Sequence, residues 1–227
     1  RRFDESDVGV ISEATADSGR VGMNAMLTFN PTIKSTMGLI TPNPDVDKTT
    51  PSEAWSIHAL TFPFSTNDDG KRINFISIQS SHLIPTVTCD RNRVRTGYER
   101  IIAHHVGRTF AGVAERDGKV TNIDEKAMLV EVTYDNGDTD VFPYGDIYNK
   151  CENFEMTQNV VVDRKLGEKF KKGDIITHNA NYFYVDHDTK QVDFTTGIMA
   201  NVAMMEHDTT LEDSCEIGEK LSQKLTI

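Results

Sequence analysis

The dipeptide Asn136-Gly137 is the feature that most restricts how this 227-residue chain can fold. Both residues tolerate a positive φ angle, which the two-residue turns of β-hairpins require. Residues 120–144, on either side of the dipeptide, are rich in β-branched and aromatic side chains, a composition that favours strands. The middle of the chain is therefore predicted to contain antiparallel strands joined by tight turns.

Two further segments predict strands of the same kind. Within residues 166–179, Gly167 and Gly173 bracket a charged tip before an apolar strand restarts, which is how small barrels turn corners. Residues 182–194 are predicted to form another hairpin that turns between residues 186 and 190. From about residue 94 onward we thus expect a series of short strands.

The first 72 residues differ from the rest of the chain in composition. They contain five of the seven prolines, and the polar tract at 41–53 predicts a loop. Residues 65–72 are predicted to form an exposed turn. Residues 73–85 show the alternating apolar pattern of a strand only in part. Little in this region predicts a self-contained core.

Residues 199–220 change abruptly from an apolar run to a group of acidic side chains. Only residues 211–221 are predicted to be helical. Carboxylates favour the positive end of a helix dipole, so a solvated helix start is the simpler interpretation. The alternative is a set of ligands for a divalent cation or for a phosphate-bearing substrate. The group consists of Glu206, His207, Asp208, Glu212, Asp213 and Glu216.

Charge and composition exclude several classes of protein. With 35 acidic against 24 basic residues, the net charge of −11 argues against a self-sufficient nucleic-acid binder. Another chain would have to supply much of the positive surface. No apolar run approaches the roughly 20 residues of a membrane span. The three cysteines are far apart and show no CxxC spacing, which favours free thiols in a reducing cytoplasm.

Motifs of a self-contained enzyme are absent, among them GxSxG, the P-loop, HExxH and the Rossmann fingerprint. His104-His105 could act as a general base, but neighbours in a strand point to opposite faces, which favours a structural role. The arginines near residue 95 could share one strand face and bind phosphate oxygens, or form a solvated, partly acid-paired surface. Both interpretations stay open for Arg91, Arg93, Arg95 and Arg100.

Seven short blocks follow one another over most of residues 19–221. They are GRVGMN (19–24), STMGLI (35–40), SHLIPT (81–86), VRTGYERIIAHHVG (94–107), ERDGKVTNID (115–124), FKKGDII (170–176) and NVAMMEHDTTLEDSCEIGEKL (201–221). Their order resembles the middle of the β subunit of multisubunit DNA-directed RNA polymerases. The family pattern there runs GRxCP…EGxNIGLI, NMQRQAVP, VGTGxE, RxGxVxxVD, KKGDVL and VAFMPWxGYNFEDAILISE. Seven matches in one order are far more specific than any single match.

The chain also departs from the family pattern. The cysteine and the TPEG of the first block are missing, and the glutamine and arginine of NMQRQ fall on Ser80, Ser81 and His82. Residues 206–211 replace PWxGYNF. Such divergence with preserved order is similar to the multisubunit polymerases of large bacteriophages, whose β subunits are often split. We therefore expect a bacteriophage origin.

The resemblance implies roles for six residues. The FED of the last block falls on 211–213, which implies that Glu212 and Asp213 support the catalytic magnesium and the triphosphate without coordinating the metal directly. The Mg²⁺ itself is expected to be held mainly by a partner β′-like subunit. Contacts with nucleic acid are expected from Arg20, Ser81, His82 and Arg95.

The implied function is a part of a multisubunit DNA-directed RNA polymerase, a nucleotidyltransferase of transcription that is inactive alone. The chain would line the RNA–DNA hybrid and the nucleoside triphosphate approach. Residues 1–72 would form an irregular fork-like segment, and residues 73–227 a β-rich hybrid-binding core. The implied fold class is mainly β with few short helices (α+β), in small barrel-like or hammerhead-like modules.

The expected partners are a β′-like subunit, the remaining β-like polypeptide, template DNA, RNA and nucleoside triphosphates, without a membrane. The expected location is the host cytoplasm or the virion. Two alternatives stay open. One is a polymerase-derived structural, virion or scaffold protein without catalysis. The other is a stand-alone metal-dependent hydrolase that uses the acidic group of residues 206–213.

Overall fold

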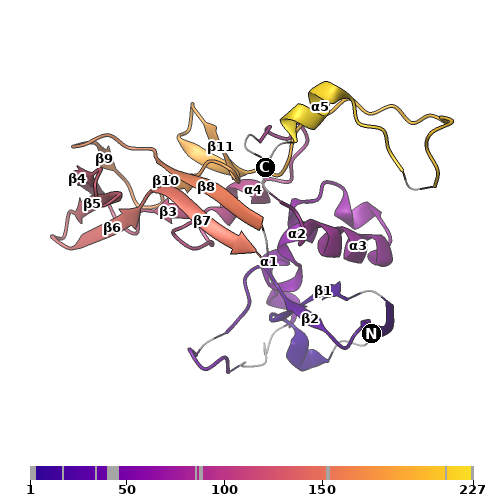
Figure 1. Ribbon diagram of the computed structural model, residues 1–227. Coiled ribbons are helices and arrows are strands. Elements are labelled where there is room, and N and C mark those ends of the chain that lie inside the picture. The colour runs from indigo at the N-terminus through magenta and orange to yellow at the C-terminus, as the bar shows by residue number, and fades with distance from the viewer. Residues whose placement is uncertain are drawn as a thin grey trace. The chain divides into compact units, whose positions relative to one another are not determined.

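The computed structural model describes residues 4–16, 18–33, 35–39, 46–84, 86, 89–151, 154–212 and 214–225. The chain forms two compact units (Figure 1). The N-terminal unit consists of Arg1–Leu83 and Val94–Tyr98, and the C-terminal unit of Ile84–Arg93 and Glu99–Ile227. The functional division that the sequence places after residue 72 stays a prediction.

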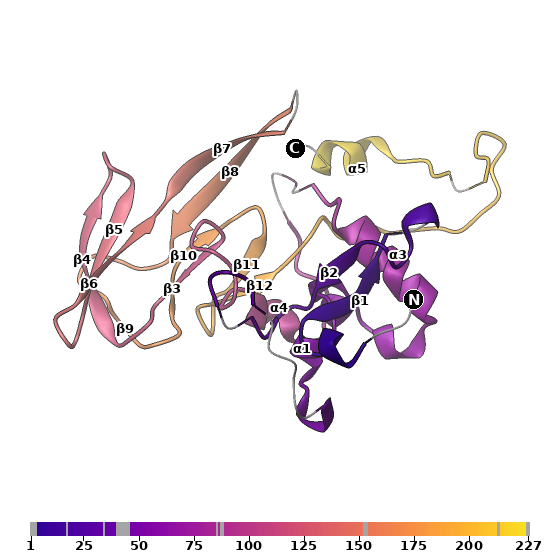
Figure 2. The same cartoon turned by 90° about the horizontal axis from the view of Figure 1, so that it is seen from below.

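The N-terminal unit combines a short hairpin with short helices. Strand β1 pairs antiparallel with β2, and α3 lies alongside β1 in both Figure 1 and Figure 2. The elements are β1 (Ile11–Thr15), β2 (Ala25–Leu27), α1 (Pro51–Ala54), α2 (Ile57–Thr61) and α3 (Gly70–Ser80), with 3-10 helices at Glu5–Asp7, Ser18–Arg20, Val46–Lys48 and Ser65–Asn67. Among its described residues, the buried apolar side chains are few and include no aromatic ring: Val10, Ala14, Ala59, Leu60 and Ile73.

Local sequence signals explain where these helices begin. Thr50 and Glu53 form a capping box, in which the backbone N–H of Thr50 donates to the Glu53 carboxylate at 2.9 Å. Pro51 occupies the first helical position, where its missing N–H is harmless. Ser56 caps α2 by accepting the backbone N–H of Ala59.

The C-terminal unit is built on two four-stranded antiparallel sheets and one hairpin. The sheets have the strand orders β3-β10-β8-β7 and β6-β5-β4-β9, and β11 pairs with β12. The elements are α4 (Tyr98–Ile102), β3 (Ala111–Val113), β4 (Gly118–Asp124), β5 (Leu129–Tyr134), β6 (Thr139–Pro143), β7 (Gly145–Cys151), β8 (Phe154–Val162), β9 (Lys169–Phe170), β10 (Ile175–Asn179), β11 (Phe183–Asp186), β12 (Gln191–Phe194) and α5 (Glu219–Lys224).

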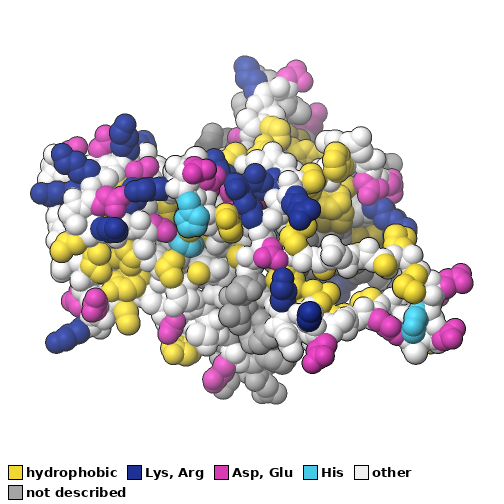
Figure 3. Space-filling view, turned by 90° about the horizontal axis from the view of Figure 1, so that it is seen from above, with side chains coloured by type: hydrophobic (Ala, Val, Ile, Leu, Met, Phe, Trp, Pro, Cys, Tyr) yellow, Lys and Arg dark blue, Asp and Glu magenta, His cyan; other side chains and the backbone are white. Residues whose placement is uncertain are grey.

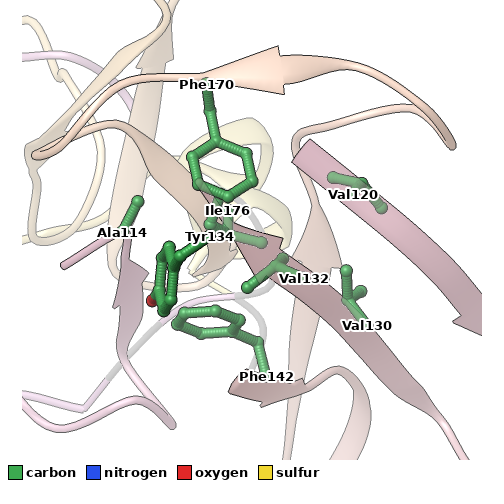
Figure 4. Packing of buried hydrophobic residues seen from close by; sticks show 8 residues of the cluster. All are labelled: Ala114, Val120, Val130, Val132, Tyr134, Phe142, Phe170 and Ile176. Carbon is green, nitrogen blue, oxygen red and sulfur yellow. The ribbon is translucent and has the colours of Figure 1, made fainter. Parts of the chain in front are cut away.

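One apolar cluster fills the core of this unit. Figure 4 shows the rings of Tyr134, Phe142 and Phe170 converging on Ile176. Tyr134 and Phe170 meet edge to face, with 6.2 Å between ring centroids, an arrangement that aromatic quadrupoles favour. The cluster consists of Ala114, Val120, Val130, Val132, Tyr134, Phe142, Phe170 and Ile176. Ile176 comes from β10 of one four-stranded sheet, Ala114 follows β3 of the same sheet, and the other members come from the second sheet, so the cluster joins the two sheets.

The predicted strand organisation is confirmed. β5 and β6 pair from Leu129↔Pro143 to Thr133↔Thr139 around the turn, where Gly137 has a φ of 88°. The hairpin predicted over 182–194 is β11 with β12, and β10 starts at Ile175 after the turn that contains Gly173. The structure is mainly β with short helices, as the fold-class prediction required.

The prediction that only residues 211–221 are helical is wrong. Helices α1 to α4 precede the two four-stranded sheets, and the last helix, α5, begins only after Gly218. Residues 73–80, where a strand-like alternation is incomplete, belong to α3. The reason is visible in the burial pattern, because Ile73 and Ser77 are buried at the i, i+4 spacing of a helix.

The loop predicted at 41–53 lies partly outside the described residues, at 41–45; the rest includes one 3-10 turn and α1. Residues 65–72, expected to be a turn, contain a 3-10 turn and the start of α3. Among the helices that the structure describes, none has the length and apolar character needed to cross a membrane.

Candidate nucleic-acid interface

Arg20 lies in the turn between β1 and β2, and its side chain is exposed. Thr15 fixes the base of this turn, because its hydroxyl accepts the N–H of Gly22 and donates to the carbonyl of Asn24, both at 2.8 Å. The backbone N–H of Thr15 donates in turn to the side chain of Asn74 in α3 at 2.9 Å. Helix α3 therefore positions the turn that presents the Arg20 guanidinium, a group suited to phosphate oxygens.

A polar network joins β1, α2 and α3. The Glu13 carboxylate accepts hydrogen bonds from the hydroxyls of Ser56 (2.5 Å) and Ser77 (3.1 Å) and from the backbone N–H of Ser56 (2.9 Å). Both serines are buried, so these bonds compensate the desolvation of the carboxylate. Burial also lowers the pKa of His58, and the nearby Glu13 opposes that effect only in part.

Ser81 and His82 terminate α3. The Ser81 hydroxyl donates to the carbonyl of Ile78 at 2.5 Å, and the His82 backbone N–H donates to Gln79 at 3.1 Å. Both side chains are exposed. The Ser81 hydroxyl still has acceptor capacity, and the His82 ring projects polar nitrogens, so both can meet nucleic acid.

Arg95 belongs to the separate segment Val94–Tyr98, which the structure assigns to the same N-terminal unit. Its side chain is exposed, and the backbone around it is irregular, with bends, before α4. All four residues expected to touch nucleic acid thus lie on one unit: in the β1–β2 turn, at the end of α3 and in this segment.

The N-terminal unit also contains an aromatic pocket, which we define by its lining residues. It has a volume of about 350 Å³. Ala59 and Leu60 are its buried residues, while Trp55 is 42% exposed and Phe64 is 73% exposed. The lining consists of Pro51, Trp55, Ala59, Leu60, Phe62, Phe64, Ser65, Thr66, Thr96 and Tyr98. The surface is therefore largely apolar, with hydroxyl groups added by Ser65, Thr66, Thr96 and Tyr98.

Backbone hydrogen bonds fix the two most exposed aromatic residues of the pocket. The backbone carbonyl of Trp55 accepts the N–H of Phe29 at 2.9 Å, and the backbone N–H of Trp55 donates to the carbonyl of Pro51 at 3.0 Å. Phe64 has a φ of 68°, in the left-handed region that a bulky residue rarely adopts. Its carbonyl accepts the N–H of Asn67 at 2.9 Å. Such conformations cost about 1–3 kcal/mol, and they cluster at functional sites.

The arginines near residue 95 do not share a strand face, because residues 91–97 form no strand. Arg91 and Arg100 instead hold the β11–β12 hairpin. The Arg91 Nη2 lies 2.6 Å from Asp193 and 3.2 Å from Asp186, and Arg100 lies 3.1 Å from Asp193 and 2.9 Å from Asp186. For these two arginines the acid-paired interpretation is correct. We call the four residues the arginine–aspartate clasp.

Two members of the clasp, Arg91 and Asp186, have shifted pKa values. The hydrogen bond to Asp193 raises the pKa of the Arg91 guanidinium. Backbone N–H groups, first that of Thr189, lower the pKa of Asp186. The Asp193 side chain is 3% exposed, so its charge depends on both arginines for compensation.

The acidic group near residue 210 forms no metal centre in the part of the chain that the structure describes. Glu206, His207, Asp208 and Glu212 are exposed, and residues 206–212 form turns and irregular backbone. His207 Nδ1 lies 3.3 Å from Glu216 Oε1. Asp213, expected to support the magnesium with Glu212, lies outside the described residues.

No described set of three His, Cys, Asp or Glu residues is arranged to hold a metal ion. The helix-start interpretation of the acidic group also needs correction, since α5 begins at Glu219.

His104 and His105 lie in a turn after α4 and are exposed, so the strand geometry expected for them is wrong. The expectation of free thiols is confirmed for Cys89 and Cys215. The Cys89 sulfur accepts a hydrogen bond from the Thr195 hydroxyl at 2.9 Å.

Sequence reasoning missed the aromatic pocket. Its signal was present, because Trp55, Phe62 and Phe64 fall within ten residues and Pro63 separates the last two. That spacing matches neither a helix face nor a strand face. Only the folded backbone, with its turn at Phe64, brings these rings to one pocket with Tyr98.

Figure 3 shows basic and acidic side chains distributed over one face of the molecule rather than gathered into one large basic area. No family model matches the chain. Over part of its length, however, the chain is similar to subunits of a nucleic-acid polymerase. The matched part of the chain is thus similar to the β subunits of multisubunit polymerases.

The relatives are DNA-directed RNA polymerase β subunits. That of Anaeromyxobacter sp. (strain K) is 33% identical over 136 residues, 58% of this chain and 9% of the relative. Those of Syntrophotalea carbinolica and Geobacter metallireducens are 31% and 29% identical over 177 and 181 residues, which cover 75% and 76% of this chain and 12% of each relative. The predicted resemblance to this subunit is confirmed, and the chain spans about a tenth of the length of these relatives.

Proposed function

We propose that this chain is one part of a multisubunit DNA-directed RNA polymerase and lines the RNA–DNA hybrid and the nucleoside triphosphate approach. The observation that carries the proposal is the similarity to RNA polymerase β subunits over up to 76% of the chain. The exposed positions of Arg20, Ser81, His82 and Arg95 on one unit support it, because each offers a polar or cationic group to a nucleic-acid backbone.

The reaction of the assembly would be template-directed nucleotidyl transfer. The 3′ oxygen of the RNA attacks the α-phosphorus of a nucleoside triphosphate, and pyrophosphate leaves. Within this assembly, the residues of this chain would bind and orient the nucleic acid. We assign the Mg²⁺ to a partner β′-like subunit. Glu212 and Asp213 remain proposed supporting residues.

The proposal includes partners and a source. A β′-like subunit and the remaining β-like polypeptide would complete the enzyme and supply positive surface that a chain of net charge −11 lacks. We propose a large bacteriophage as the source, and the host cytoplasm or the virion as the location.

Co-expression with candidate β′-like and β-like polypeptides tests the proposal. We expect a stable complex that extends RNA on a DNA template. In this complex Arg20→Ala with Arg95→Ala should lower RNA extension about tenfold or more, because two phosphate contacts are lost. Arg116→Ala is the matched control, since Arg116 pairs with Asp138 at a hairpin tip of the other unit.

A second pair of variants tests the supporting acids. Glu212→Ala with Asp213→Ala should slow nucleotide addition at limiting triphosphate and leave assembly intact. A chain that forms only a homo-oligomer, and that extends no RNA with any partner, would contradict the proposal and favour the scaffold alternative.

A further inference from the structure

We propose that the aromatic pocket of the N-terminal unit takes one unpaired nucleobase of a single nucleic-acid strand. The inference deepens the proposed function and rests on it for the kind of strand involved. The pocket itself is an observation on this unit alone, since every lining residue belongs to Arg1–Leu83 or Val94–Tyr98.

The size of the pocket suits a single planar group. Its volume of about 350 Å³ lies at the lower end of the range of roughly 300–1,000 Å³ that small-ligand sites occupy. A base with part of its sugar fits such a space, whereas a duplex does not. The base must therefore be unpaired before it enters.

The lining suits the two faces and the edge of a base. Trp55, Phe62, Phe64 and Tyr98 offer aromatic surface, and stacking on aromatic side chains tolerates every base because each has a π-face. Ser65, Thr66 and Thr96 add hydroxyl groups to the lining. The Thr66 hydroxyl donates to Asn67, and its oxygen keeps capacity to accept a hydrogen bond from the polar edge of a base.

The exposure of two rings indicates that the pocket is incomplete without an occupant. Trp55 and Phe64 are 42% and 73% exposed, although the backbone of each is held by hydrogen bonds. Phe64 keeps its left-handed φ of 68° while its ring faces water. A stacked base would cover apolar surface that is otherwise hydrated.

A cationic side chain beside the pocket favours a nucleic-acid strand over an apolar protein segment as the occupant. Arg95 is exposed and precedes Thr96 of the pocket lining by one residue, so a phosphate beside a bound base would lie near a guanidinium. The N-terminal unit carries 8 Lys and Arg against 10 Asp and Glu, whereas the C-terminal unit carries 16 against 25. A polyanion is therefore repelled less by the unit that contains the pocket.

The chain offers a direct readout, because Trp55 is its single tryptophan. We would titrate the complete chain with a twelve-residue oligothymidylate at low salt and follow the tryptophan fluorescence. Stacking should give saturable quenching. A blunt duplex of equal length and inorganic phosphate should give little quenching, because neither offers an unpaired base.

Matched variants locate the effect. Phe64→Ala should weaken the oligonucleotide affinity about tenfold, within the range for loss of one stacking partner. Arg95→Gln should weaken it a few-fold and reduce its salt dependence. Tyr148→Ala removes a 76% exposed aromatic side chain from the other unit and should change nothing. Circular dichroism checks that each variant is folded, and photo-crosslinking of an iodouridine strand should label residues 51–66 or 94–98.

Several outcomes would overturn the inference. They are the absence of quenching by the single strand, equal quenching by the duplex, and an affinity that Phe64→Ala leaves unchanged. A change in Trp55 emission that requires a partner polypeptide, with no response to oligonucleotide, would assign the pocket to a protein contact instead. RNA extension by the assembled complex is measured separately. Extension without quenching overturns the pocket alone, and quenching without extension overturns the polymerase proposal alone.

Discussion

The two units of this chain use their side chains in different ways. The C-terminal unit buries a cluster of eight residues between antiparallel strands and pairs many of its charges internally. The N-terminal unit has a small core, relies on the Glu13 network to join its elements, and leaves Trp55 and Phe64 exposed. The difference shows that one unit is stabilised by its own apolar packing, while the other relies more on polar contacts and leaves aromatic surface uncovered.

The largest expected effect comes from truncating the core of the C-terminal unit. Phe142 is fully buried, and Phe142→Ala should lower the free energy of unfolding by about 3–5 kcal/mol, because it removes transfer energy and leaves a cavity. Urea unfolding followed by circular dichroism measures this loss. Trp55 fluorescence reports on the N-terminal unit alone and should shift much less. If both signals shift equally, the units unfold as one block and the comparison fails.

The arginine–aspartate clasp should give the next largest effect. Asp193→Asn keeps the shape of the side chain but removes the charge that two arginines share, so we expect a loss of about 2–3 kcal/mol in the C-terminal unit. Thermal unfolding measures it. Asp188→Asn, at an exposed position of the same hairpin, is the control and should stay within about 0.5 kcal/mol of the parent chain.

A smaller effect depends on pH. The backbone N–H of Lys165, followed by the side chains of Lys190 and Arg164, lowers the pKa of Glu168 from 4.5 to about 2. Since the folded pKa lies below the unfolded one, the carboxylate stabilises the fold above pH 4.5, and this contribution is lost as the pH falls toward 2. After allowance for solvent screening, we expect about 1–2 kcal/mol at pH 7.

Glu168→Gln tests this dependence. The stability difference from the parent chain should be largest near pH 7, shrink between about pH 4.5 and 2, and be small below that range. Urea titrations at several pH values measure it. A difference that is independent of pH would show that the Glu168 charge does not stabilise the C-terminal unit.

The smallest effect is expected in the N-terminal unit. Ser77→Ala removes one of the hydroxyl donors to Glu13, while Ser56 still supplies two hydrogen bonds, so the loss should be about 1 kcal/mol. Urea unfolding followed by Trp55 fluorescence measures it directly. A loss above about 3 kcal/mol would mean that this network, rather than apolar packing, supplies most of the stability of the unit.

The strands could be predicted from the sequence because their signals are local. Gly137 and Gly173 mark turns that need a positive φ, and alternation fixes the strands beside them. The helices of the N-terminal unit were missed because α1 and α2 span only four and five residues, too few to show a helical period. In α3 the decisive contacts are with Glu13 and Thr15, more than fifty residues away.

The candidate site was predictable only where the family pattern supplied it. Order along the chain pointed to Arg20, Ser81, His82 and Arg95, and the structure places all four on one unit. The aromatic pocket joins Tyr98 to residues about forty positions earlier, and no periodicity records such a contact. The pairing of Arg91 and Arg100 with Asp193 likewise depends on residues about a hundred positions apart, so the spacing of the arginines could not predict it.

The arginine–aspartate clasp limits which substitutions this sequence can accept. Asp186 and Asp193 each bind both Arg91 and Arg100. A charge reversal at one of these positions therefore cannot be compensated by a charge reversal at only one other position. Substitutions at the four positions therefore depend on one another. Among homologous chains we expect them to be retained together or replaced together, most simply by apolar residues of similar volume, and intermediates with three of the four should be rare.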